Sequence, residues 1–502
     1  MQTVDASAYS KSGRMDPTPP AKYFIALCAG ILGTLAFAPF NFWWLGLISI
    51  AIWMWLSIHK PGFFVGFVYG LGFFGSGVSW ISVSMTEHGG ASIPLAFTMT
   101  SLFAAGLAIF PGLASWGYAS WHQRWPSALG RVCLLTACWV TMEAFRSWFL
   151  TGFPWLLMGY SALGTPFEGY LSWVGVFGVS ALIALTSGGL LASLLDRRFI
   201  TLIIPCVLLI TGPILNEEFE PDEKPAYATR VALWQPVIAQ TKKWNPEFRG
   251  RIVEQHVVNG LPLDVDVTIW PETALPMTES RVNSTLPDLD LKLLSGSKTL
   301  ITGVLGQSEG RYTNRLITLG LGQGTYDKTR LVPFGEYVPL DSLLRGLIAF
   351  FDLPMSTISP GPQQNLLTHG YLKFGPLICY EIAYTGQARE IAKDANVILT
   401  VSNDTWFGDS IGPDQHLQIA QIRARELGKP VVRATNDGLT AFINGRGQVE
   451  KILPRFRPAV LSHSLIPATT VTPYSSAGEA PLIILLVVIL TLTRRNEAFK
   501  PK

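Results

Sequence analysis

The side chain with the clearest potential for chemistry is Cys379, which ends the short apolar run Lys373–Cys379. Such a run is typical of a buried strand, and it would deliver the thiol to the carboxyl end of that strand. The other cysteines stand in long apolar runs upstream, at Cys28, Cys133, Cys138 and Cys206. Cys379 thus has no disulfide partner in the polar part of the chain. A lone thiol needs a base to act as a nucleophile, so a buried structural cysteine is the alternative interpretation of this run alone.

A carboxylate and an amine stand at the ends of two other predicted strands. Glu272 follows the apolar run Val265–Trp270, at a position where α/β folds place active sites. Lys328 follows a glycine-rich strand end, and Glu336 lies in the next loop, where it could orient the lysine. Taken singly, each is more simply a solvated loop charge. Together with Cys379 they predict acyl chemistry, in which Glu272 is the base, Lys328 stabilises an oxyanion and the thiol attacks a carbonyl.

The composition indicates a membrane protein with a soluble part. The chain has 502 residues, of which 49% are hydrophobic and 15% charged, a balance too apolar for an ordinary soluble enzyme. The net charge of +3 gives no case for nucleic-acid binding. Five scattered cysteines are inconsistent with a disulfide scaffold, and their spacing shows no metal site.

Eight apolar segments are expected to cross a membrane, since a helix needs roughly 20 residues to span the hydrocarbon. Seven of them divide residues 22–215 and an eighth follows near the end: 22–40, 43–58, 62–82, 91–119, 128–148, 171–194, 197–215 and 480–493. Alternate loops carry the positive charges that stay in the cytoplasm, namely Lys60, Arg124, Arg131, Arg197 and Arg198. The polar tails 1–21 and 494–502 are then cytoplasmic, and residues 216–479 lie outside, in the periplasm of a bacterium.

Residues 216–479 have the pattern of an α/β sandwich domain. Short runs such as Val397–Ser402 and Val431–Thr435 predict buried strands, and Gln415–Leu427 predicts a helix. About 260 residues suffice for a core of their own. His416 falls on a polar face of the predicted helix, and we assign it no catalytic role because the site already has a carboxylate base.

The order of glutamate, lysine and cysteine, each near a strand end, resembles the nitrilase superfamily. Trp270-Pro271-Glu272, Lys328 and Cys379-Tyr380-Glu381 resemble its three motifs. With the apolar segments added, the chain resembles the apolipoprotein N-acyltransferases of the bacterial inner membrane nearly end to end. Specific strings that carry this resemblance are Leu331–Pro339, Ser402–Phe407 and Gly152–Trp155. The fold it implies is mixed: an eight-helix transmembrane bundle and an extracytoplasmic α/β nitrilase-like αββα sandwich.

The resemblance also implies a reaction in two halves. Cys379 would take the sn-1 acyl chain of phosphatidylethanolamine as a thioester, and the α-amino group of a diacylglyceryl-cysteine apolipoprotein would then receive it. Glu272 would serve as base and Lys328 would stabilise the oxyanion. Further essential supporting residues would be Glu336, Tyr380 and Glu381. The family requires no cofactor and no metal, and we expect a monomer.

Four apolar residues are candidates for contact with lipid. Leu347 and Phe351 belong to the apolar stretch Leu343–Phe351, which is either a core helix or a lid that dips into lipid. Trp155 either lines a lipid entrance or anchors the chain at the membrane interface. Trp244 either touches the acyl chain, by resemblance, or packs in the domain.

Two other functions are also compatible with these sequence features. A membrane-tethered nitrilase-like amidase would employ the same residues, but water would resolve the thioester, so its product differs. A transporter with an external ligand-binding domain belongs to another class. Transporters tend to place ionisable residues in mid-membrane in matched halves, and the apolar segments here are almost free of charge.

Overall fold

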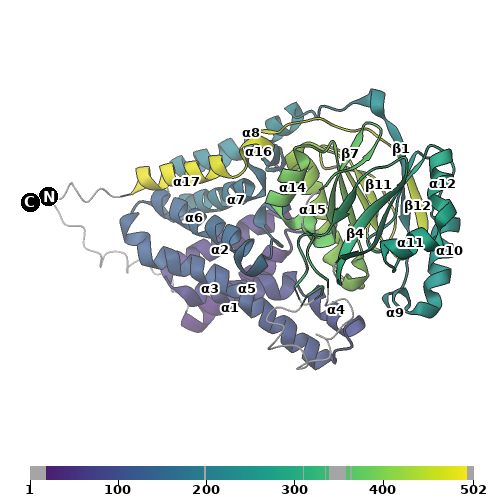
Figure 1. Ribbon diagram of the computed structural model, residues 1–502. Coiled ribbons are helices and arrows are strands. Elements are labelled where there is room, and N and C mark those ends of the chain that lie inside the picture. The colour runs from purple at the N-terminus through teal and green to yellow at the C-terminus, as the bar shows by residue number, and fades with distance from the viewer. Residues whose placement is uncertain are drawn as a thin grey trace, which may run out of the picture.

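Long apolar stretches form the helices of the first part of the chain. The computed structural model describes residues 18–196, 199–308, 310–333, 335–337, 358–361 and 365–494. The helices before the first strand are α1 Pro19–Thr34, α2 Trp43–His59, α3 Phe63–Gly77, α4 Trp80–Glu87, α5 Ile93–Trp121, α6 Ala128–Arg146, α7 Leu171–Asp196 and α8 Ile203–Glu218. They pack into one body, which α17 (Ala480–Thr493) joins along α6 and α7 (Figure 1).

Among the described residues, four helices are long and apolar enough to cross a membrane, or five if α3 and α4 count as one span bent by 50°. Shorter apolar helices cover Pro20–Thr34, Trp43–His59 and Ala480–Thr493. The expected segment 62–82 is therefore not one straight helix. The eight spans remain a prediction, because three of the eight segments form helices shorter than a full crossing.

Glycines let α1, α3 and α5 approach backbone to backbone. A Cβ atom built on Gly66 of α3 would lie 2.0 Å from the carbonyl oxygen of Pro111 in α5. One built on Gly30 of α1 would lie 2.1 Å from the carbonyl oxygen of Tyr69. Apolar burial does not drive helices together inside lipid, so such close packing is the expected source of their association.

The second part of the chain contains two sheets with strands in the orders β12-β1-β2-β3-β4-β5 and β11-β10-β9-β8-β7-β6 over the described residues. The first sheet consists of β12 Ala459–Leu465, β1 Thr229–Gln235, β2 Val267–Ile269, β3 Thr299–Ser308, β4 Arg311–Gly320 and β5 Thr325–Asp327. The second consists of β11 Val449–Ile452, β10 Ala441–Ile443, β9 Val431–Thr435, β8 Val397–Ser402, β7 Leu372–Ile378 and β6 Leu367–His369. Strands β1–β3 and β7–β9 pair in parallel. Within each sheet, the carboxyl ends of these parallel strands therefore lie at the same edge.

Helices cover both sheets. One sheet packs against α11 (Glu279–Thr285) and α12 (Pro287–Ser295) and shares a hydrophobic cluster with α10 (Arg249–Asn259), and the other packs against α14 (Thr385–Ala392) and α15 (Gly412–Leu427). Figure 1 shows α14 and α15 between the sheets and the helical part. This helix–sheet–sheet–helix arrangement confirms the predicted α/β sandwich. Its parallel strands β2, β8 and β9 are buried along their whole length, as near-continuous apolar runs require, whereas β11 and β12 are partly exposed.

A buried polar junction joins the two parts. Gly175, with φ of +65°, breaks α7, and the backbone N–H of Val176 donates to Glu426 Oε1 of α15 at 2.5 Å. Glu426 pairs with Arg423 one turn earlier. Arg423 in turn donates to the hydroxyl of Tyr160 at 2.7 Å. These charges are paired and hydrogen-bonded, as buried charges must be to be tolerated.

Candidate active site

The strand β7 ends at the nucleophile proposed from the sequence. Cys379 opens the 3₁₀ turn Cys379–Ala383, and its φ of +55° lies in the left-handed region that non-glycine residues rarely adopt. A residue held in this region stores strain, which persists only where the surroundings fix it. The sharp change from strand to turn places Cys379, as a half-buried residue, at the carboxyl end of β7.

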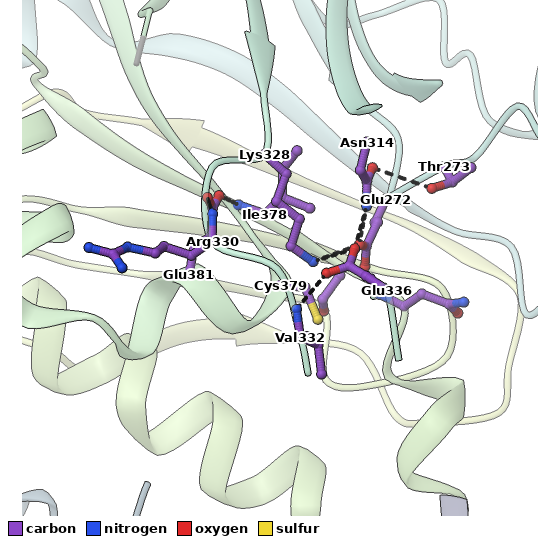
Figure 2. Close-up of polar contacts among 12 residues, drawn as sticks. Glu272, Thr273, Asn314, Lys328, Arg330, Val332, Glu336, Ile378, Cys379 and Glu381 are labelled. Atoms are coloured by element: carbon purple, nitrogen blue, oxygen red, sulfur yellow. Dashed lines mark hydrogen bonds and ion pairs between the residues drawn. The ribbon is translucent and has the colours of Figure 1, made fainter. Parts of the chain in front are cut away.

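Three charges from the other sheet and its loops meet beside the thiol. Lys328 Nζ lies 2.9 Å from Glu336 Oε1 and 3.4 Å from Glu272 Oε1, and only 1% of the Lys328 side chain is exposed. Figure 2 shows the Cys379 sulfur near the point where the Lys328 amine meets the carboxylates of Glu272 and Glu336. The charges of these three groups shift the pKa of the thiol. The structure thus brings together Glu272, Lys328, Glu336 and Cys379. Their catalytic roles stay a proposal.

The charges set the protonation of this cluster. Desolvation, reinforced by the charge of Glu272, raises the pKa of the Cys379 thiol well above its ordinary value. Burial opposes the charge of Lys328, but Glu336 and Glu272 outweigh it and raise the pKa of the ammonium. The lysine is therefore a fixed cation. The thiol is not a preformed thiolate near neutral pH, so it reacts only if a base removes its proton during attack.

Two asparagines that the sequence reasoning missed hold Glu272. Asn314 Nδ2 donates to Glu272 Oε1 at 2.6 Å and faces Glu336 Oε1 at 3.3 Å. The backbone N–H of Asn403 donates to Glu272 Oε2 at 2.9 Å. Asn314 is 1% exposed in the middle of β4. The sequence signal for Asn314 was a polar residue within a buried strand. Its partners could not be predicted from that signal, because they lie far away in the sequence.

Glu381 connects the turn Cys379–Ala383 to the loop that follows Lys328. Its Oε1 accepts from the backbone N–H groups of Thr329 at 2.7 Å and Arg330 at 2.9 Å. Its Oε2 accepts from the Ile378 N–H and the Tyr326 hydroxyl, both at 2.8 Å. The carboxylate is fully buried. It therefore fixes the residues on either side of the site without facing the cluster itself.

Tyr380 and Trp155 stack on each other, with ring centroids 6.2 Å apart and planes inclined by 20°. The hydroxyl of Tyr380 donates to the carbonyl oxygen of Gly152 at 3.3 Å, so the residue after the nucleophile binds the loop that follows α6. Trp155 is 1% exposed and its Nε1 donates to Gln415 at 2.6 Å. This burial argues against an anchor at the membrane interface, and a lining of the lipid entrance stays a prediction.

Glu143 and Arg146 of α6 each have a backbone partner in the segment that follows this helix and contains Trp155. Arg146 Nη1 donates to the Trp155 carbonyl at 2.7 Å, and Glu143 Oε1 accepts from the Met158 N–H at 2.7 Å. Both side chains of α6 thus hold the loop on which Tyr380 rests.

A second amine, Lys243, also touches Glu272. Its Nζ donates to the backbone carbonyl of Glu272 at 3.0 Å, and burial lowers the pKa of this lysine to about 8. Its neighbour Trp244 is half-buried at the end of α9 (Gln240–Lys243). Leu347 and Phe351 lie outside the described residues. Contact of these three apolar residues with lipid stays a prediction.

His416 lies on the predicted polar face of α15, and that face is buried. The residue is 1% exposed, and its Nε2 lies 3.1 Å from the carbonyl oxygen of Cys379. The polar face therefore packs against the turn Cys379–Ala383. No cluster of three or more metal-ligating side chains occurs in the part of the chain that the structure describes.

Comparison with known proteins agrees with this arrangement. A model described as the apolipoprotein N-acyltransferase N-terminal domain matches residues 29–189, and one described as carbon-nitrogen hydrolase matches residues 230–470. An apolipoprotein N-acyltransferase of Pseudomonas aeruginosa is 41% identical over 96% of this chain and 97% of that protein. The chain belongs to the apolipoprotein N-acyltransferase family.

Other members are similar over the same extent. One from Azotobacter vinelandii is 40% identical, covering 95% of this chain and 96% of its own, and one from Photobacterium profundum is 38% identical with the same coverage. The matches run through both the helical part and the α/β part. Membership of the family therefore concerns the whole chain rather than its nitrilase-like part alone.

Proposed function

We propose that this chain transfers an acyl chain from a phospholipid, through a thioester on Cys379, to the N-terminal amino group of a diacylated apolipoprotein. The observation that carries the proposal is the buried cluster of Lys328 with Glu272 and Glu336 beside the thiol. Membership of the family supports the reaction, and the apolar helices support a site at the membrane, because both substrates are lipids. The relatives are named as acyltransferases, which argues against a transporter.

In the first half-reaction, Glu272 takes the thiol proton as Cys379 Sγ adds to the ester carbonyl carbon of the sn-1 chain of phosphatidylethanolamine. The carbonyl oxygen becomes an oxyanion, which the Lys328 ammonium stabilises. The carbon–oxygen bond then breaks, and the proton on Glu272 passes to the departing alkoxide. The products are the thioester and a lysophospholipid.

In the second half-reaction, the amine of diacylglyceryl-cysteine adds to the thioester carbonyl and loses a proton to Glu272. The carbon–sulfur bond breaks and the proton returns to the sulfur, which leaves an amide and the free thiol. Glu336 holds the lysine throughout, and Tyr380 and Glu381 hold the nucleophile turn. Water in place of the amine would turn the same site into a hydrolase.

The proposed topology follows the loop charges. Residues 22–215 form seven spans and residues 480–493 an eighth, in the bacterial inner membrane, with residues 216–479 in the periplasm. The tails 1–21 and 494–502 are cytoplasmic, and the protein acts as a monomer. The positive charges at Lys60, Arg124 and Arg131 support this orientation.

The test is the intact mass of the purified protein after incubation with phosphatidylethanolamine, beside a Cys379→Ala control. We expect a gain of one acyl chain that hydroxylamine removes and that the control lacks. A diacylglyceryl peptide should then discharge the chain onto its amine. Release of free fatty acid in the presence of that peptide, with no acylated amine, would refute the transferase in favour of a hydrolase.

A further inference from the structure

The imidazole of His416 contacts the backbone carbonyl of Cys379, the proposed nucleophile. Its Nε2 is 3.1 Å from the Cys379 carbonyl oxygen, and its Nδ1 is 3.2 Å from Asp404 Oδ1. Arg433 Nη2 lies 3.0 Å from the same Nδ1 and donates to Asp404 Oδ2 at 2.6 Å. All three side chains are buried. None of them has a part in the proton and acyl transfers set out above.

The surroundings dictate which nitrogen of His416 carries a hydrogen towards Cys379. A carbonyl oxygen only accepts, so Nε2 must be the donor in this contact. Burial and the nearby Arg433 lower the pKa of His416, which favours the neutral ring. Nδ1 has a donor, Arg433 Nη2, at 3.0 Å and an acceptor, Asp404 Oδ1, at 3.2 Å, and Asp404 also holds the guanidinium in place. The hydrogen on Nε2 follows from the contact with the Cys379 carbonyl in either protonation state of Nδ1.

The hydrogen bond acts on a strained peptide. Cys379 has a φ of +55°, and its carbonyl group forms one planar unit with the N–H of Tyr380. The carbonyl oxygen and this N–H point in opposite directions, so a donor that fixes the oxygen also fixes the N–H. Tyr380 is the second residue of the turn Cys379–Ala383, where a backbone N–H has no partner within the turn.

We infer that His416 is a positioning residue, which holds the Cys379–Tyr380 peptide so that the Tyr380 N–H and the Lys328 ammonium face the same oxyanion. The inference rests on the proposed function. Without the imidazole, the strained peptide is free to rotate and the N–H turns away. Glu272 and Lys328 stay in place, since other contacts hold them.

The role of His416 can be separated from support of the fold by comparing two reactions of the same thiol. Thioester formation passes through an oxyanion, whereas alkylation by iodoacetamide displaces iodide from carbon without one. We would measure both rates, and the midpoint of thermal unfolding, for wild type, His416→Phe and His416→Gln. The glutamine amide can donate to the Cys379 carbonyl, and the phenyl ring cannot. His256→Phe, which removes a buried imidazole elsewhere, is the matched control.

In His416→Phe we expect thioester formation to fall by about 100-fold, as when one oxyanion donor is lost, with alkylation little changed. His416→Gln should recover most of the rate, and His256→Phe should change neither. If His416→Phe does not fold, His416→Asn replaces it, because its shorter amide cannot reach the carbonyl.

Two results would overturn the inference alone: normal thioester formation in His416→Phe, or an equal fall of both rates. Equal falls would mean that the ring only supports the fold around the thiol. A wild-type protein that is alkylated normally but forms no thioester would overturn the proposed function, and this inference with it.

Discussion

The contacts of Glu381 allow a quantitative prediction about what holds the site together. Its two oxygens accept only from donors, including three backbone N–H groups of Ile378, Thr329 and Arg330. In Glu381→Gln an amide NH₂ takes the place of one oxygen. If it takes the place of Oε2, it faces the Ile378 N–H, donor against donor. The hydroxyl of Tyr326 can rotate to accept, but a backbone N–H cannot.

The expected loss of stability is about 3–4 kcal/mol, because one buried donor is left unsatisfied and the remaining bonds lose the charge that strengthened them. Tyr326→Phe is the matched control. It removes one donor of Glu381 and leaves the carboxylate, so its loss should be about 1 kcal/mol. Since Glu381 binds both Ile378 and the loop after Lys328, its replacement should also separate the thiol from the lysine.

The assay combines thermal unfolding in detergent with single-turnover thioester formation. We expect Glu381→Gln to lower the unfolding midpoint and the acylation rate together, and Tyr326→Phe to lower both only slightly. A Glu381→Gln protein as stable as wild type would refute the reasoning. Full stability with no thioester would show instead that the carboxylate takes part in the chemistry.

Two further predictions concern Glu272 and the buried His256. Asn314→Asp puts a third carboxylate beside Glu272 and Glu336. The repulsion among the three carboxylates should slow single-turnover acylation at least about tenfold. An unchanged rate would contradict the proposed role of Glu272. Burial lowers the pKa of His256 from 6.5 to about 4. Between these two pH values the imidazole is protonated in the unfolded chain and neutral in the folded protein, so stability falls as the pH falls. The resulting loss of stability is about 2 kcal/mol at pH 5. His256→Phe should therefore lose less of its unfolding midpoint than wild type between pH 7 and pH 5, and equal losses would count against the prediction.

The sequence could predict the convergence of Glu272, Lys328 and Cys379 because each stands at the end of a strand. α/β folds place active sites at such strand ends, and the three residues follow β2 and β5 of one sheet and β7 of the other. How the two sheets face each other, which brings these ends together, is not visible in the strand pattern. The strands themselves were visible as apolar runs. The roles of these residues remain a proposal that the thioester experiment tests.

The partners of the cluster could not be predicted in the same way. Asn314 and His416 owe their positions to packing between elements far apart in the sequence, 42 residues for the bond to Glu272 and 37 for the contact with Cys379. On its own helix His416 belongs to a polar face, and the sequence does not show that this face is buried. The bend of 50° between α3 and α4 was likewise hidden, because an apolar run shows hydropathy but no direction.

The buried junction at α7 has a consequence for the order in which the protein is made. The N–H of Val176, freed by the break at Gly175, finds its acceptor in Glu426, 250 residues later in the chain. At about 5–20 residues per second, a ribosome needs roughly 10–50 s to reach that acceptor. Until then the broken end of α7 has no partner from α15. The helical part therefore reaches its final form only after the α/β part has been synthesised and has docked against it.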